Sequence, residues 1–142
     1  MKKAIQIGFS ISVMLLALFT IFRIPLSKAF VEKEITTFLN GVIAKDLDVA
    51  SDFYTHHIEL ETIQQNLEQD GFGLISFSDV EGEYDDGCVC TGHVNLTFDN
   101  NGEPLSVRAV FTDSKQVCAM SSSNERFPVT SKWNKYAYGG DF

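Results

Sequence analysis

The sequence predicts an α+β protein, with an N-terminal transmembrane helix followed by about three helices packed on a four-stranded antiparallel meander. Residues 4–22 form an apolar run without a single charge. Between residues 26 and 70 the apolar side chains recur at spacings of three and four, the pattern of helices with one buried face. From residue 74 to residue 121 they alternate with polar side chains, the period of half-buried strands.

The apolar run is long enough to be a membrane anchor. Its 19 residues, AIQIGFSISVMLLALFTIF, would span roughly 28 Å as a helix, close to the thickness of a bilayer core. Lys2 and Lys3 precede it, which favours a cytoplasmic N-terminus, although Arg23 and Lys28 reduce the asymmetry. We therefore expect a single-pass membrane protein whose C-terminal domain is extracytoplasmic, and periplasmic in a Gram-negative bacterium.

A cleaved signal peptide is the competing interpretation of the same segment. Ser27-Lys28-Ala29 has small residues at the positions that a cleavage site requires. The apolar run is nevertheless longer than the usual 7–15 residues of a signal peptide, and Arg23 and Pro25 separate it from that site. The retained signal-anchor is the favoured prediction.

The next part of the chain predicts three helices. Pro25 fits the first turn of a new helix, or a kink just outside the bilayer. Asp46 is a suitable cap for the second helix, and Gly71 a suitable stop for the third. The expected helices cover residues 26–44, 47–54 and 58–70.

The alternating region predicts four strands joined by short turns. An acidic turn is expected at residues 81–87, a hairpin loop at 99–104 and a second turn at Asp113-Ser114. If Phe98 lies opposite Leu105, apolar residues face each other along the whole central pair. The expected strands cover residues 74–80, 88–98, 105–111 and 115–121.

The last 21 residues show no clear period. This polar tail carries Trp133, Tyr136 and Tyr138, which would form an interaction segment or cover an edge of the sheet. The expected organisation is therefore a cytoplasmic stub and anchor at 1–23, an α+β domain at 24–121 and a tail at 122–142.

The charge of the chain excludes one class of partner. The formal net charge is −8, and without Lys2, Lys3 and Arg23 the rest holds 8 basic against 19 acidic residues. Such a domain repels the phosphate backbone of nucleic acids, so no nucleic-acid partner is expected. A basic protein partner or a cation is easier to accommodate.

Two stretches resemble a known group of folds. FLNGVIAKDLDVASDFY (38–54) is similar to the helix, short break and acidic-aromatic second helix that open many NTF2-like domains, and LTFDNNGEPLSVRAVF (96–111) supplies a matching hairpin. The chain thus resembles the small NTF2-like members of the cystatin-like folds. The resemblance implies a cup-shaped pocket between helix and sheet, in a group that includes binding modules, dimerisation modules and some enzymes with an acid-base pair in the pocket.

The three cysteines allow three interpretations. In an oxidising compartment, Cys118 would form a disulfide with Cys88 or Cys90, but the expected register places Cys118 about two strand spacings away. Buried free thiols are equally consistent with the sequence. The third interpretation is a soft-metal site for Cu(I), in which Cys88, Cys90, Cys118 and Met120 would be the ligands.

Other polar residues give weaker signals. His56 and His57, with Asp52 and Glu59 nearby, allow a proton-transfer pair but better fit a solvated loop. The acidic stretch at 79–86 lacks the glycine and terminal glutamate of a calcium loop.

His93 would face away from the paired cysteines, on the same side of the sheet as Arg108. These two residues would mark a polar pocket wall or the solvent face of the sheet.

No catalytic set emerges, and no cofactor is expected. The leading hypothesis is a non-enzymatic, membrane-anchored binding or accessory module for an envelope protein or complex, with the membrane and a protein, itself possibly membrane-bound, as partners. A copper-handling protein and an NTF2-like pocket enzyme are the alternatives.

Overall fold

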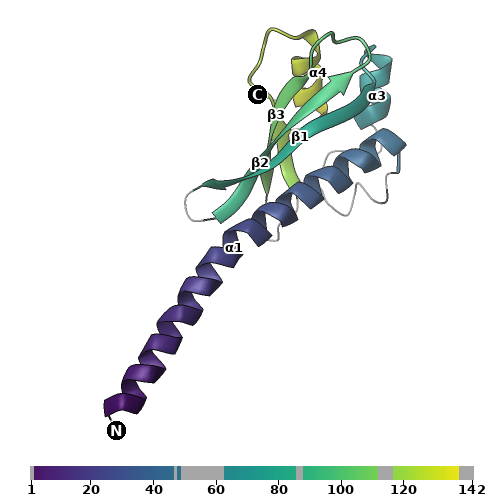
Figure 1. Ribbon diagram of the computed structural model, residues 1–142. Coiled ribbons are helices and arrows are strands. Elements are labelled where there is room, and N and C mark those ends of the chain that lie inside the picture. The colour runs from purple at the N-terminus through teal and green to yellow at the C-terminus, as the bar shows by residue number, and fades with distance from the viewer. Residues whose placement is uncertain (1, 47, 49–62, 86–87, 112–116, 138–142) are drawn as a thin grey trace.

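The computed structural model describes residues 2–46, 48, 63–85, 88–111 and 117–137, and within these ranges the side chains except those of residues 2–10, 16, 19–26, 85, 88, 89 and 118. The described chain is α+β, with its helices set against one antiparallel sheet (Figure 1). The elements are α1 (Lys2–Ala44), α3 (Ile63–Gln69), β1 (Leu74–Asp85), β2 (Cys88–Phe98), β3 (Leu105–Phe111), β4 (Val117–Ser121) and α4 (Pro128–Ala137).

Helix α1 is continuous over 43 residues. Its N-terminal half projects away from the domain, whereas its C-terminal half lies along the sheet (Figure 1). No new helix begins at Pro25, so that alternative is wrong, whereas the alternative of a kink stays a prediction. Proline removes a single backbone hydrogen bond from a helix, and the turns on its C-terminal side are held by core residues such as Val31 and Ile35.

Within the residues that can be described, none of the helices is both long and apolar enough to cross a membrane.

The sheet is the predicted meander, with strand order β1-β2-β3-β4 and every neighbouring pair antiparallel. Its inner face carries alternate residues of the central strands, and the described helices pack there to form one core. The fully buried members of this core include Ile35, Phe38 and Leu39 from α1, Leu96 and Phe98 from β2, and Trp133 from α4.

The register between β2 and β3 differs from the predicted one by two residues. Leu96 lies opposite Leu105 and Val94 opposite Val107, so Phe98 extends past the end of β3 and pairs with Leu74 of β1 instead. A slip of two residues keeps every side chain on the same face, so the apolar pattern cannot distinguish the two registers. Beyond the end of β2, the backbone N–H of Gly73 donates to Asp99 Oδ1 at 2.7 Å, a contact that joins the start of β1 to the end of β2.

Strand β1 is longer than predicted, because the expected acidic turn at 81–87 is largely strand. Glu81, Gly82 and Glu83 pair with His93, Gly92 and Thr91 of β2. The strand accommodates this length through an irregularity between Ser78 and Glu81, where Asp79 has a φ of 52°. The one extra residue at this bulge changes the direction in which the acidic side chains after it point.

Helix α3 ends at the predicted glycine. The N–H of Phe72 donates to Leu67 O at 2.7 Å and that of Gly71 to Glu68 O at 3.0 Å, the pair of bonds that defines a Schellman motif. Gly71 has a φ of +85°, a conformation that L side chains rarely adopt. Of the predicted helix at 47–54 only residue 48 is described, and residues 58–62 of the helix predicted at 58–70 lie outside the described residues.

The C-terminal tail contains a helix that was not predicted. In α4, Val129, Trp133 and Ala137 are buried in the common core at helical spacing, and the Trp133 ring lies edge-on to Phe98 with centroids 5.9 Å apart. Residues 128–137 are therefore part of the domain rather than a tail appended to it. Pro128 at the first helical position was the available sequence signal.

Two paired glycines let α1 lie directly on the sheet. Gly82 and Gly92 are partners across β1 and β2. A Cβ on Gly82 would come within 2.9 Å of Lys28 O, and one on Gly92 within 2.7 Å of Ile35 Cδ1. Both distances are shorter than real Cβ contacts, so only glycine permits this approach of helix to sheet.

Candidate functional site

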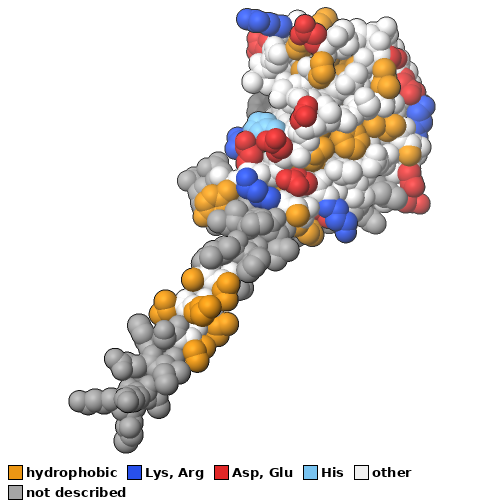
Figure 2. All heavy atoms as spheres, viewed as in Figure 1, with side chains coloured by type: hydrophobic (Ala, Val, Ile, Leu, Met, Phe, Trp, Pro, Cys, Tyr) orange, Lys and Arg blue, Asp and Glu red, His pale blue; other side chains and the backbone are white. Residues whose placement is uncertain are grey.

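The outer face of the sheet is the candidate functional site. Because successive strand residues point to opposite faces, the neighbours of the core residues in β1, β2 and β3 point away from the core. Glu81 and Arg108 are exposed there, and Glu83, His93 and Asn95 are partly exposed. Figure 2 shows acidic side chains gathered over the β1–β2 end of the domain.

Glu83 and His93 form the central contact of this face. Glu83 Oε2 lies 3.1 Å from His93 Nε2. In the strand register His93 lies opposite Glu81 on one side and Arg108 on the other. The predicted placement of His93 and Arg108 on one face is thus confirmed, and the face adjoins solvent at both residues.

Asp79 adds a preorganised carboxylate at the bulge. Asn95 Nδ2 and Ser78 Oγ each donate a hydrogen bond to Asp79 Oδ2, both at 2.9 Å. These two bonds, that of Asn95 first, hold the pKa of Asp79 below its ordinary value. Asp79 therefore remains a fixed negative charge beside the Glu81–His93 pair.

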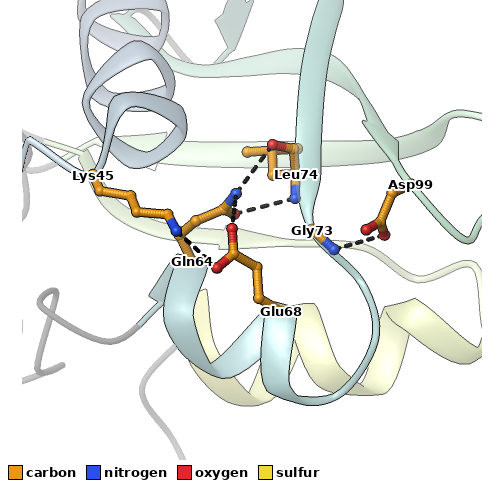
Figure 3. A network of polar contacts seen from close by, with 6 residues as sticks. All are labelled: Lys45, Gln64, Glu68, Gly73, Leu74 and Asp99. Carbon is orange, nitrogen blue, oxygen red and sulfur yellow. Dashed lines mark hydrogen bonds and ion pairs between the residues drawn. The ribbon is translucent and has the colours of Figure 1, made fainter.

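A second polar cluster surrounds Gln64 and has a structural role (Figure 3). The Gln64 amide exchanges hydrogen bonds with both backbone polar groups of Leu74 and also donates to Glu68 Oε1 at 3.3 Å. Glu68 Oε2 in turn contacts Lys45 Nζ at 2.8 Å, which joins the end of α1 to α3. These contacts tie the helices to the start of β1 and leave no group directed at a ligand.

Helix α4 carries the counterpart of this cluster. Asn134 exchanges hydrogen bonds with the N–H and the C=O of Ser122, at 2.9 and 2.8 Å. Tyr136 OH donates to Asp70 Oδ2 at 2.6 Å, and Lys132 Nζ lies 3.2 Å from the same oxygen. The bond from Tyr136, followed by that from Lys132, lowers the pKa of Asp70, while the pKa of Tyr136 is raised.

Glu34 is a buried carboxyl that the sequence analysis did not single out. It lies on α1 beside the core residue Ile35 and is only 7% exposed. Burial raises its pKa above the ordinary value, although Lys33 opposes the shift. Its position three residues after Val31 in the apolar stripe is the signal that could have identified it.

The residues of the predicted copper site are only partly described. Cys90 is disulfide-bonded, whereas the side chains of Cys88 and Cys118 lie outside the description. Met120 is fully buried in the core. A sulfur in a disulfide is not a thiolate ligand, so Cys90 is unsuited to bind Cu(I) in this state.

Among the described residues, no three His, Cys, Asp or Glu side chains are grouped so that they could hold a metal ion. The strand pairing of Glu81 and Glu83 also replaces the turn in which a calcium loop was considered. His56, His57, Asp52, Glu59 and Tyr138 lie outside the described residues, as does the turn at Asp113-Ser114.

In comparisons with known proteins, no family model, curated protein or solved structure matches the chain. The fold and the outer face together define an α+β domain with a polar, acidic sheet surface and a projecting N-terminal helix.

Proposed function

We propose that this chain is a non-enzymatic accessory module, anchored in a membrane by Ala4–Phe22, that presents its sheet domain to an envelope protein or complex outside the cytoplasm. One observation carries the proposal. The C-terminal half of α1 supplies core residues, whereas the N-terminal half of the same helix leaves large apolar side chains exposed. These are Ile11, Val13, Met14, Leu15 and Leu18, which are 40–66% exposed.

Successive helical residues are about 100° apart, so Ile11, Met14, Leu15 and Leu18 lie within an arc of about 100° and Val13 lies on the opposite side of the helix. Large apolar side chains are therefore exposed on both sides of this half of α1. A helix that is apolar all round is stable when lipid or protein encloses it. Together with the uncharged sequence of residues 4–22, this supports an anchor in lipid.

The acidic outer face supports a basic protein as the partner. Asp79 is hydrogen-bonded to Asn95, Glu81 pairs with His93 across the strands, and Glu83 contacts the same histidine. The chain as a whole carries a net charge of −8. Complementary charge steers association and selects against acidic surfaces. An anchored domain meets such a partner at the membrane, so an envelope protein is the favoured class.

The anchor is tested with the full chain expressed in bacterial membranes. We expect the wild-type chain to resist carbonate extraction and to float with the membranes. Replacing both Met14 and Leu15 by Arg introduces two charges at the centre of the segment, at roughly 2.5–3.5 kcal/mol each, and should release the protein. Ile75→Arg adds a charge to an exposed apolar site on β1 and should change nothing. A wild-type chain extracted by carbonate would refute the anchor.

The partner is tested by co-purification after gentle detergent extraction. We expect a salt-sensitive partner to be retained by the wild-type chain and by Glu125→Lys, which reverses an exposed charge outside the sheet. Glu81→Lys should lose it. A protein that purifies as a monomer without any partner, or a partner retained equally by both variants, would contradict the proposed surface.

The copper-handling and pocket-enzyme alternatives have less support. The disulfide at Cys90 removes one proposed thiolate ligand. The described core between helices and sheet consists mainly of apolar side chains, although Glu34 and Gln64 are also buried. Glu34 is the single feature that favours an NTF2-like pocket enzyme, because a buried carboxyl with a raised pKa suits proton transfer.

A further inference from the structure

Tyr84 occupies the end of the domain from which α1 emerges. Helix α1 and strand β1 run in opposite directions, because Lys28 packs on Gly82 at one end while Lys45 is joined through Glu68 and Gln64 to the start of β1 at the other. Tyr84 therefore lies beyond Gly82 toward the projecting half of α1. Figure 1 shows the C-terminal end of β1 and the start of β2 at this same end.

The position of Tyr84 along the axis of α1 can be derived from the rise per residue of a strand and of an α-helix. Two strand residues advance about 7 Å, which corresponds to four or five helical residues. Counted back from Lys28, Tyr84 is roughly level with residues 23–25. This is immediately outside the apolar run, which ends at Phe22 and is followed by Arg23.

We infer that the end of the domain carrying Tyr84 rests in the headgroup layer of the bilayer, with the Tyr84 ring as an interfacial anchor. The inference rests on the proposed membrane anchor. Tyr84 is 52% exposed and lies two residues after Gly82 on β1. A tyrosine ring is favoured at this depth, because its body is apolar and its hydroxyl stays hydrated.

The neighbouring charges fit a zwitterionic lipid surface. Lys28, partly exposed on α1, is close enough to reach headgroup phosphates along its flexible stem. Glu81 and Glu83 on β1 would repel anionic headgroups. The occupant of this surface is therefore a phosphatidylcholine-like bilayer surface rather than an anionic one.

Depth-dependent fluorescence quenching tests the inference on the full chain. The protein is reconstituted in phosphatidylcholine vesicles whose acyl chains carry bromine near the headgroup, as Tyr84→Trp and, separately, as Ile75→Trp. Ile75 is the matched control, since it is 56% exposed on the same strand but at the opposite end. Trp133 is buried in the core and adds the same background to both variants.

We expect the added emission of Tyr84→Trp to be quenched several-fold more strongly than that of Ile75→Trp. Equal quenching, or none at position 84 in protein that floats with the vesicles and resists carbonate, would overturn the inference and leave the anchor intact. A blue-shifted but unquenched Tyr84→Trp would overturn it in favour of a protein contact. Protein that does not stay with the vesicles would refute anchor and inference together.

Discussion

Gln64 pairs with Leu74 as a neighbouring strand would. Gln64 Nε2 donates to Leu74 O at 3.2 Å, and the Leu74 N–H donates to Gln64 Oε1 at 3.1 Å. Leu74 opens β1, an edge strand, and Asn134 makes the same two-bond contact with Ser122 directly after the other edge strand, β4. Edge strands expose unpaired backbone groups that promote association. The Gln64 side chain satisfies the backbone groups of Leu74, and the Asn134 side chain satisfies those of Ser122.

Loss of the Gln64 amide should destabilise the domain. Gln64→Ala leaves the N–H and C=O of Leu74 buried without partners, and we expect a loss of about 2–3 kcal/mol in the free energy of unfolding. Gln69→Ala removes the same side chain from an exposed position of the same helix and should cost less than about 0.5 kcal/mol. Urea unfolding of both variants measures the difference, and equal losses would show that the pairing contributes nothing.

Gly82→Ala should separate α1 from the sheet. The new Cβ would meet the Lys28 backbone, which has no rotamer to relieve the contact, so we expect a loss of about 2 kcal/mol or more. Gly102→Ala is the control, since nothing lies within 4 Å of its Cβ. Thermal unfolding followed by circular dichroism compares them. An unchanged midpoint for Gly82→Ala would contradict the direct contact.

Glu34→Gln should stabilise the protein at neutral pH. The folded-state pKa of Glu34 is raised above its ordinary value of 4.5 by burial, so at pH 7 the domain holds a charge in a site that disfavours it. We expect a gain of about 1 kcal/mol at pH 7. The gain should shrink as the pH falls through the raised pKa, because wild-type Glu34 then takes up a proton. A gain independent of pH would point to a different cause.

Tyr136→Phe should destabilise the domain in a defined pH window. The hydroxyl of Tyr136 donates to Asp70, and this hydrogen bond is stronger when the carboxyl group of Asp70 is charged. Asp70 has a lowered folded-state pKa, so its contribution is present above the ordinary value of 3.8 and is lost as the pH falls through the lowered pKa. The difference in midpoint between Tyr136→Phe and wild type should therefore be largest near pH 7 and smaller at pH 2–3. Thermal scans across this range would reveal a constant difference if the bond were unimportant.

The cysteines should yield one reactive thiol per chain. The chain has three cysteines, and a disulfide at Cys90 uses two of them. Titration of the denatured, unreduced protein with a thiol reagent measures the number, and peptide mapping identifies whether Cys88 or Cys118 is the partner. A count of three would exclude the disulfide. Under these non-reducing conditions we also expect no stoichiometric Cu(I) binding, whereas binding that persists would restore the copper hypothesis.

The sequence pattern predicted the bounds of the strands better than their register and the packing of the helices. The bounds of β2 and β3 follow from strict alternation, which ends where Asp, Asn and Gly begin. Their register did not follow, because a shift by two residues keeps every side chain on the same face and is neutral to the pattern. Helix α4 was missed because its ten residues expose more polar than apolar side chains, and only Trp133 and its neighbours at helical spacing reach the core.

The candidate surface was predicted only in outline. His93 and Arg108 were placed on one face by period two, yet the contribution of Glu81 and Glu83 was assigned to a turn. Acidic residues have low strand propensity, and here the pairing with β2 overrides it. Gln64 and Asn134 gave no signal at all, since an amide that completes a sheet edge is defined by tertiary geometry alone.

The unbroken course of α1 has a mechanical consequence. A flexible linker would limit only the distance between the domain and the N-terminal segment. A continuous helix whose C-terminal half is part of the core also fixes the direction in which each surface of the domain points. Inserting or deleting one residue in α1 would rotate one half of the helix relative to the other by about 100°, and the acidic face would turn by the same angle. A rotation of the N-terminal half of α1 about the helix axis would therefore carry the domain and its acidic face with it.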